Sequence, residues 1–238
     1  MSILFVVATP IGNLSDFSSR AIETLSTVSV IACEDTRTSS KLLKHFGIQT
    51  PTSSLHQHNE HHKYTYFIGQ LDNGNDVAII TDAGMPGISD PGFLMIRAAH
   101  QAGHQVRVIP GPDAVSSALV SSGLPSDSYY FHGFLPHKKG RQKQWELLAD
   151  LDCTIILYES PHRLLKCLRE SEHYLGEGRM VAVCRELTKT FEETVRGTVK
   201  EVTSQFEQRT SIKGEICVVF APKNYQETLA QNGHHDDA

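Results

Sequence analysis

The sequence contains no long apolar run. Nowhere in its 238 residues does an uninterrupted apolar stretch approach the ~20 residues of a membrane-spanning helix. The apolar start, MSILFVVATPIGN, has no basic segment before it, and its apolar run ends at Ala8, unlike a secretory signal peptide. We therefore expect no contact with a membrane, and a first buried strand near the N-terminus.

Cysteine is scarce and scattered. The five cysteines, Cys33, Cys153, Cys167, Cys184 and Cys217, are odd in number, and no two form a CxxC pair. Disulfide frameworks and cysteine-based zinc sites both require paired or closely spaced cysteines. The sequence therefore predicts mostly buried, free thiols and a cytoplasmic protein.

Positive charge is not in excess either. The chain has 22 lysines and arginines against 27 acidic residues, which gives a net charge of -5. A protein that binds nucleic acid over most of its surface has the opposite balance. This composition excludes that class and leaves room only for a local basic patch, such as HKKGRQKQW (137–145).

The two commonest nucleotide-binding motifs are missing. The first apolar run is followed by ATPIGNL, not by the G-x-G-x-x-G of a dinucleotide-binding fold. The G-x-x-x-x-G-K-[ST] of a phosphate-binding loop does not occur. Both classes of nucleotide site are therefore disfavoured.

What the chain does have is an alternation of apolar runs and helical patterns. Runs rich in Val and Ile at 3–8, 30–34, 76–82 and 105–111 are each followed by a stretch with helical spacing. The runs are nearly continuous rather than alternating with polar residues, as in strands that are covered on both faces. The sequence predicts an α/β fold with a parallel sheet in its first half.

The pattern restarts after residue 128 and ends differently, with FEETVRGTVKEV and then GEICVVFAP. We therefore expect two α/β domains, the second with a mixed sheet. The expected boundaries are 1–113 for the first domain, 114–125 for a linker region and 126–224 for the second domain. A flexible tail is expected over 225–238.

Polar loops rich in glycine and proline follow seven of the expected strands. In open α/β sheets, ligands bind beyond the carboxyl ends of the strands. Turn formation alone accounts for any single loop of this kind, but less well for all seven. The loops are ATPIGNL, CEDTR, TDAGMPGISDPG, PGPDA, GFLPHKKG, ESPHR and RELTKTFEE.

Six motifs in one order carry a family resemblance: ATPIGNLSD, CEDTR, TDAGMPGISDPG, VIPGPDA, HGFLP and YESPHR. They resemble the signature motifs of the ribosomal small-subunit methyltransferase I family, in the tetrapyrrole methylase superfamily. The resemblance extends from about Ile3 to Pro222. It implies two α/β domains that bind S-adenosylmethionine (AdoMet) between them, in a homodimer. It also implies methylation of a cytidine ribose 2′-hydroxyl in small-subunit ribosomal RNA, as free RNA or as an assembled subunit.

The third loop is the main candidate for the cofactor. Gly84 and Gly87 allow close backbone approach and Pro86 restricts the loop, so amides there can meet the methionine carboxylate. Asp82 either touches the ligand or shapes the turn. The resemblance places further cofactor residues at Pro10, Ile88, Ala114 and Val115, and on the adenosine side at Leu135, Arg185 and Gly214. Core packing is the alternative for the apolar members.

Carboxylates at the end of the second strand are the catalytic candidates. A sulfonium methyl group is already activated, whereas a ribose hydroxyl is a poor nucleophile that a nearby base would help. Glu34 and Asp35 are best placed for this task, with Arg37 beside them to bind a phosphate or keep a carboxylate ionised. An N-cap for the following helix is the alternative role for Asp35.

The candidate RNA contacts come from two motifs. Single-stranded RNA is usually bound through its phosphates and by stacking on aromatic side chains. Lys138, Lys139 and Arg141 belong to the basic run, in which Lys143 follows, and His162 and Arg163 belong to ESPHR. A solvated helix face is the alternative interpretation of such a charge run.

A histidine group in LHQHNEHHK suggests a metal site at first sight. His56, His58, His61 and His62 do not follow the spacing of a zinc site, and no cysteine accompanies them. The related family has a similar stretch, which implies a loop at the substrate or dimer face. We therefore expect no metal.

Three departures from the family pattern and two other functions stay open. Met85 stands where the family has a small polar residue, Asp113 replaces a serine, and the sequence ends at Ala238 where many members continue. A tetrapyrrole-precursor C-methyltransferase is one alternative, but that subgroup has a GPGDP-like first loop and lacks CEDTR and ESPHR. A non-catalytic RNA-binding α/β protein is the other.

Overall fold

The computed structural model describes residues 2–56 and 60–226, and for 60–62 the backbone only. The chain forms two compact units, Met1–Ser117 with Glu186–Glu193, and Ala118–Arg185 with Thr194–Ala238. The division falls inside the region expected as a linker, 114–125, most of which is the helix α5 (Ala114–Ser122). The segment 186–193, expected in the second domain, groups with the first unit because the backbone of Gly12 lies against the side chain of Lys189.

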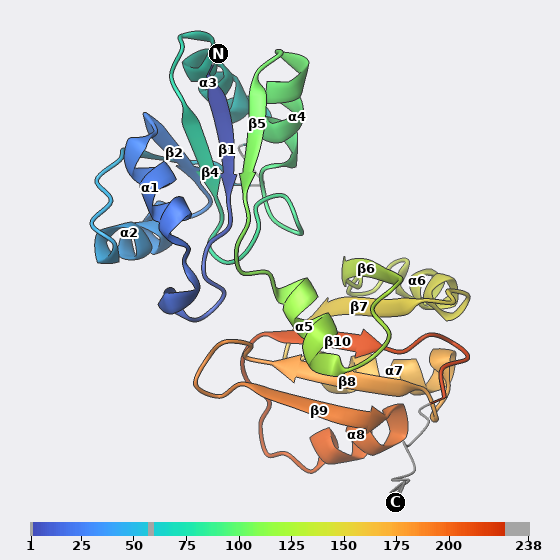
Figure 1. Ribbon diagram of the computed structural model, residues 1–238. Helices are drawn as coiled ribbons and strands as arrows, with labels where there is room; N and C mark the ends of the chain where they lie inside the picture. Colours follow the sequence, from blue (N-terminus) through green and yellow to red (C-terminus); the bar gives the residue numbers. More distant parts are fainter. Residues whose placement is uncertain (1, 57–59, 227–238) are drawn as a thin grey trace, which may run out of the picture. The chain divides into compact units, whose positions relative to one another are not determined.

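The first unit contains a five-stranded sheet in the order β3-β2-β4-β1-β5, and its neighbouring strands all run parallel (Figure 1). This confirms the parallel sheet predicted from the continuous apolar runs. Its strands are β1 (Ile3–Val7), β2 (Val30–Cys33), β3 (Thr52–Ser54), β4 (Val77–Ile80) and β5 (Gln105–Ile109). Its helices are η1 (Leu14–Asp16), α1 (Ser19–Thr27), α2 (Thr36–His45), α3 (Glu60–Asp72), α4 (Phe93–Gln101) and the start of α5 (Ala114–Ser122).

Each face of this sheet has its own core. Ile31 and Ile80 pack with α1 and α2 on one face, whereas Val30 and Ile79 pack with α3 and α4 on the other. Neighbouring residues of β2 and β4 therefore alternate between two buried faces, and both strands are buried throughout. Polar side chains therefore follow the ends of these strands, where the loops begin.

The second unit contains a mixed sheet in the order β6-β7-β10-β8-β9. Strands β6 and β7 are parallel, and β10 runs antiparallel to both β7 and β8. The mixed sheet is therefore also confirmed. The strands are β6 (Tyr129–Phe134), β7 (Thr154–Glu159), β8 (Met180–Arg185), β9 (Glu193–Thr198) and β10 (Ile216–Phe220). The helices are α6 (Arg141–Ala149), α7 (Leu164–Leu175) and α8 (Val199–Glu207).

One face of the second sheet carries the main core of this unit. Ile155 and Leu157 of β7 pack there with Trp145 of α6, Leu168 of α7 and Phe206 of α8. Each side chain is fully buried, and burying a large apolar side chain contributes about 1.5–3 kcal/mol. Ile156 and Tyr158 therefore belong to the opposite face of the strand.

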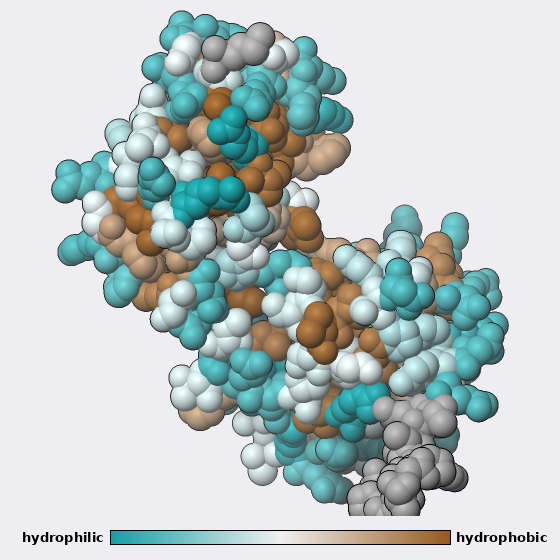
Figure 2. Space-filling view, in the orientation of Figure 1, coloured by the Kyte–Doolittle hydropathy of each residue, from teal (hydrophilic) through white to brown (hydrophobic). Residues whose placement is uncertain are grey.

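The surface of the protein carries both hydrophilic and apolar side chains. Apolar side chains reach the surface of both units among hydrophilic ones (Figure 2). Within 2–56 and 60–226, no helix combines the length and apolar character needed to cross a membrane. The expected tail, 225–238, lies outside the described residues from 227 onward.

Candidate functional site at the strand ends

The first and third loops of unit 1 are joined to each other by backbone hydrogen bonds. Thr9 N donates to Gly84 O at 2.9 Å, and Gly84 N donates to Thr9 O at 3.1 Å. The Thr9 hydroxyl also donates to Thr81 O at 3.0 Å. ATPIGNL and TDAGMPGISDPG thus form one continuous surface at the carboxyl ends of β1 and β4.

The third loop has a backbone that requires glycine. Gly84, Gly87 and Gly92 have φ angles of 85°, 84° and 127°, a region that other residues rarely adopt. Gly87 N donates to Pro91 O at 3.0 Å, which closes the loop. Ser89 adopts a φ of 62° in the same loop, so one non-glycine residue is also held in the left-handed region.

A group of carboxylates lies beside this loop. The Thr81 hydroxyl donates to Glu34 Oε2 at 3.0 Å, and Asp35 N donates to Asp82 Oδ1 at 3.3 Å. These bonds join the ends of β2 and β4. The sequence-based choice of Glu34, Asp35 and Asp82 therefore selected residues that the fold brings together.

Asp90 also belongs to this group of carboxylates, and the sequence did not identify it. Burial and then the nearby Glu34 charge raise the pKa of Asp90 to about 6, although the polar side chain of Thr81 nearby partly lowers it. Burial also raises the pKa of Asp82. In the sequence Asp90 stands between Ser89 and Pro91, which is ordinary turn chemistry, so no signal distinguished it.

Asp35 both caps helix α2 and pairs with the side chain of Arg37. Its Oδ1 accepts from Arg37 N at 2.8 Å, as an N-cap of α2, and its Oδ2 accepts from Arg37 Nη2 at 2.8 Å. These hydrogen bonds lower the pKa of Asp35 to about 2. A carboxylate with so low a pKa is a weak base near neutral pH. The guanidinium of Arg37 is itself exposed, with 88% of its side chain accessible.

The remaining cofactor candidates of unit 1 differ in exposure. Pro10 and Ala114 are half-buried, Ile88 is 40% exposed, and both Pro86 and Val115 are buried. The buried pair contributes to packing, the alternative given for apolar members. All lie in the loops or the helix start that the sequence motifs indicated.

Two departures from the family pattern have structural explanations. Asp113 accepts from Ser116 N at 2.8 Å and from Val115 N at 3.4 Å, so it caps α5. Serine and aspartate are comparable N-caps, and the exchange preserves the helix start. Met85 is partly buried and packs against the core formed with α3 and α4, so its side chain fills space beneath the loop.

The candidate cofactor residues of unit 2 fall into two groups. Arg185 Nη1 donates to Lys213 O at 3.0 Å, directly before Gly214, which has a φ of 93°. The structure thus brings Arg185 and Gly214 together at the ends of β8 and β10. Leu135, in contrast, is 1% exposed and its side chain belongs to the core, although its carbonyl accepts from Arg163 Nη1 at 3.5 Å.

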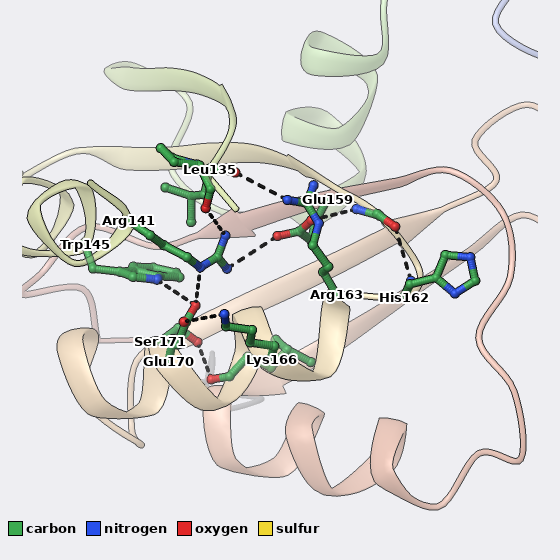
Figure 3. A network of polar contacts seen from close by, with 12 residues as sticks. Leu135, Arg141, Trp145, Glu159, His162, Arg163, Lys166, Glu170 and Ser171 are labelled. Carbon is green, nitrogen blue, oxygen red and sulfur yellow. Dashed lines mark hydrogen bonds and ion pairs between the residues drawn. The ribbon is translucent and has the colours of Figure 1, made fainter. Parts of the chain in front are cut away.

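Arg141 is not placed as an RNA contact would be, which corrects the expectation from the charge run. It is 4% exposed, and its Nε lies 2.7 Å from Glu170 Oε2 (Figure 3). Its Nη2 lies 3.6 Å from Glu159 Oε2, and Arg163 Nη2 lies 2.9 Å from Glu159 Oε1. Both arginines are therefore engaged in an internal ion network, with 18% of the Arg163 side chain exposed. Lys138, Lys139 and His162 are exposed, and their contact with RNA stays a prediction.

The histidine stretch is only partly described. His56 is half-buried, His58 lies outside the described residues, and His61 and His62 fall in α3 without described side chains. In the portion of the chain that the structure covers, no group of three or more His, Cys, Asp or Glu side chains is arranged to hold a metal ion.

Comparison with known proteins assigns the chain to a family. The family model of the tetrapyrrole (corrin/porphyrin) methylases matches residues 4–203. Ribosomal RNA small subunit methyltransferase I of Synechocystis sp. is 48% identical over 222 residues, which cover 93% of this chain and 79% of the relative. The chain belongs to the ribosomal RNA small subunit methyltransferase I family, within the tetrapyrrole methylases. The Haemophilus influenzae member is 44% identical over 93% of this chain and 79% of its own length.

Solved structures confirm the fold of this methyltransferase I family member. A uroporphyrin-III-C-methyltransferase from Thermus thermophilus matches with a TM-score of 0.63 at 15% identity, covering 94% of this chain and 96% of that one. Diphthine synthase matches with a TM-score of 0.70 at 11% identity, covering 93% and 90%. At such low identity these matches show the tetrapyrrole methylase fold alone.

Proposed function

We propose that this chain transfers the methyl group of AdoMet to the 2′-hydroxyl of a cytidine ribose in small-subunit ribosomal RNA. The observation that carries the proposal is the 48% identity to a ribosomal RNA small subunit methyltransferase I over 79% of that protein. The solved tetrapyrrole-precursor methyltransferases that resemble this chain are 17% identical or less, so they show the shared fold and give no support for that substrate. The ribose position and the cytidine come from the family resemblance of the motifs.

The loops of unit 1 fit a cofactor such as AdoMet. A Cβ added at Gly84 would lie 3.4 Å from Ile11 Cγ2 and 3.9 Å from Pro112 O. A Cβ at Gly111 would lie 3.0 Å from Ala8 Cβ. Because glycine has no side chain at these two positions, the backbone of three loops stays open to a ligand. This arrangement suits the close approach of a carboxylate to main-chain amides.

The residues around this cradle would position the reactants. When bound, AdoMet supplies an activated methyl group, so the protein has mainly to align the hydroxyl oxygen with it. Glu34, which accepts a hydrogen bond from the Thr81 hydroxyl, is our candidate to accept a hydrogen bond from the ribose. Arg37 is largely exposed and paired with Asp35, and we propose it as the phosphate contact.

Other parts of the proposal rest on composition and exposure. Lys138, Lys139 and His162 are exposed and remain proposed RNA contacts. All five cysteines are free, which supports a reducing cytoplasm. The homodimer is part of the proposal because the family resemblance of the motifs implies it.

The test is incubation of the protein with labelled AdoMet and small ribosomal subunits, followed by nucleoside analysis. We expect label in 2′-O-methylcytidine. Label on a base alone, or no label in RNA, would refute the proposal. Uroporphyrinogen-type precursors in a parallel reaction test the tetrapyrrole alternative, and free ribosomal RNA beside intact subunits identifies which form is the substrate.

A further inference from the structure

An exposed aromatic side chain stands at the end of the edge strand β6. Phe134 is 53% exposed, although it follows Gly133 in a strand of the sheet. Its ring centroid lies 5.5 Å from that of Tyr158, which in turn lies 5.0 Å from that of Phe131. The two strands are parallel, with Phe134 paired to Tyr158 in register. The three rings thus form a row that ends in an exposed face of Phe134.

Exposed positive charge follows this ring directly in the chain. Lys138 and Lys139 lie in the loop after β6, and Lys143 lies in the first turn of α6. All three are exposed, and none has an ion-pair partner among the residues described by the structure. Glu146, the acidic residue of α6, accepts a hydrogen bond from Gln142 at 2.9 Å. The charge available beside Phe134 is therefore positive and suits an anionic partner.

The buried ion network fixes the loop that joins the ring to the lysines. Arg163 Nη1 donates to Leu135 O at 3.5 Å, and Arg141 Nη1 donates to Pro136 O at 3.1 Å (Figure 3). Both arginines are in turn paired with Glu159, whose side chain is 1% exposed. The backbone after Phe134 is thus held by two charged side chains, Arg141 at the start of α6 and Arg163 directly before α7. A surface that is already ordered loses little entropy on binding.

We propose that Phe134, together with Lys138, Lys139 and Lys143, forms a surface that stacks on an unpaired base of the RNA and binds the adjoining phosphates. The proposal rests on the proposed function, because it takes ribosomal RNA as the partner. A base within a duplex is stacked on its neighbours and offers no free face, so the RNA segment at this surface is single-stranded. An aromatic ring beside lysines is the combination that single-stranded RNA recognition uses.

The two kinds of residue predict different changes in binding. Phe134→Ala should weaken the binding of a single-stranded RNA by about 5- to 160-fold at every salt concentration, because one stacking contact is lost. Phe134→Trp should preserve the affinity. The double variant Lys138→Gln/Lys139→Gln should instead reduce the slope of log K against log salt by about 1.4, the value for two phosphate contacts on a single strand.

The experiment measures fluorescence anisotropy with a single-stranded 20-nucleotide segment of small-subunit ribosomal RNA, and with the same segment in a duplex, over a salt series. Tyr129→Ala is the matched control, since Tyr129 is 50% exposed at the other end of the same strand. Thermal unfolding establishes that each variant is folded. Equal affinity of the wild type and Phe134→Ala for the single strand, or an equal loss with Tyr129→Ala, would overturn the proposal.

Failure of this inference and failure of the proposed function give different results. If the wild type methylates ribosomal RNA while Phe134→Ala leaves the KM for RNA unchanged, the stacking surface is refuted and the methyltransferase stands. If the wild type transfers no methyl group but Phe134→Ala still weakens single-strand binding, the surface is supported and the proposed reaction is refuted. Binding of Phe134 to a ribosomal protein in place of RNA would appear as wild-type RNA affinity in Phe134→Ala, and also refutes it.

Discussion

The hydroxyl of Thr81 lies 3.0 Å from Glu34 Oε2 and donates to it, although the two residues are 47 positions apart. Thr81 is 2% exposed and directly follows β4, whereas Glu34 directly follows β2. The two strands are neighbours in the parallel sheet, so their carboxyl ends coincide. The fold thereby holds one carboxylate of the candidate site in a fixed orientation.

Replacing Thr81 with valine tests whether this orientation matters. The side chains are similar in size, but valine cannot donate, so Glu34 loses its partner. We expect kcat for methyl transfer to fall at least 10-fold while the KM for AdoMet stays within about twofold, since a misaligned hydroxyl affects mainly the transition state. The loss of this part-buried hydrogen bond to a carboxylate should cost about 1–3 kcal/mol in the free energy of unfolding.

Thr81→Ser is the control for this change, because it retains the hydroxyl. It should keep a kcat close to that of the wild type. Steady-state kinetics with small ribosomal subunits measures both variants. If Thr81→Val and Thr81→Ser turn over at the same rate, Glu34 does not depend on this hydrogen bond for its role.

The pKa of about 6 at Asp90 predicts a dependence of stability on pH. A raised pKa means that the folded state favours protonated Asp90, so this contribution to stability is present below about pH 4 and is lost as the pH rises through about 6. Glu34 and Asp82, both acidic, face the group and disfavour its ionised form. Asp90→Asn keeps the neutral state at all pH values. Its stability relative to the wild type should therefore increase between pH 4 and pH 6 and then level off.

Urea unfolding of both proteins at pH 4.5, 5.5, 6.5 and 8 measures this difference. Asp127→Asn, at an exposed site in the second unit, provides a matched loss of one carboxyl group. A difference between Asp90→Asn and the wild type that is constant from pH 4.5 to pH 8 would contradict an elevated pKa at Asp90.

The sheets and loops could be predicted from the sequence because their signals are local. Continuous apolar runs identify strands buried on both faces, and Asp35 before Thr36 identifies a helix start. Arg141 could not be placed, because its burial depends on Glu159 and Glu170, which are distant in the chain. The same basic run contains Lys138, which is exposed. The composition of the run does not distinguish the buried Arg141 from the exposed Lys138.

Because Arg141 is buried in an ion network, we expect its substitution to lower the stability of the protein more than its affinity for RNA. Arg141→Met removes one partner of a buried ion network and leaves Glu159 with less compensation of its charge. We expect a loss of about 3–5 kcal/mol in the free energy of unfolding. Lys143→Met, two positions further on and exposed, should change it by no more than about 0.5 kcal/mol.

Urea unfolding with a check of two-state behaviour measures both variants. In the double variant Arg141→Met/Glu170→Gln, the carboxylate that lies 2.7 Å from Arg141 Nε in the wild type is neutralised, so part of the lost stability should return. A wild-type unfolding midpoint for Arg141→Met would show that the network does not stabilise the second unit. An equal effect of Arg141→Met and Lys143→Met would lead to the same conclusion.

The last prediction concerns Gly92, the glycine that ends the third loop. Gly92 has a φ of 127°, and a Cβ there would lie 2.9 Å from Ile79 Cδ1, in a side chain that is 2% exposed. Gly47 has a φ of 70° with nothing within 4 Å of its Cβ position. Gly47→Ala should cost about 1–2 kcal/mol for the left-handed backbone alone. Gly92→Ala adds the displacement of a packed core side chain, which costs about 1–3 kcal/mol more, and should also weaken AdoMet binding because the loop shifts. Urea unfolding and calorimetric titration with AdoMet measure the two effects; equal losses of stability at both glycines, with AdoMet affinity unchanged, would show that Ile79 yields without disturbing the loop.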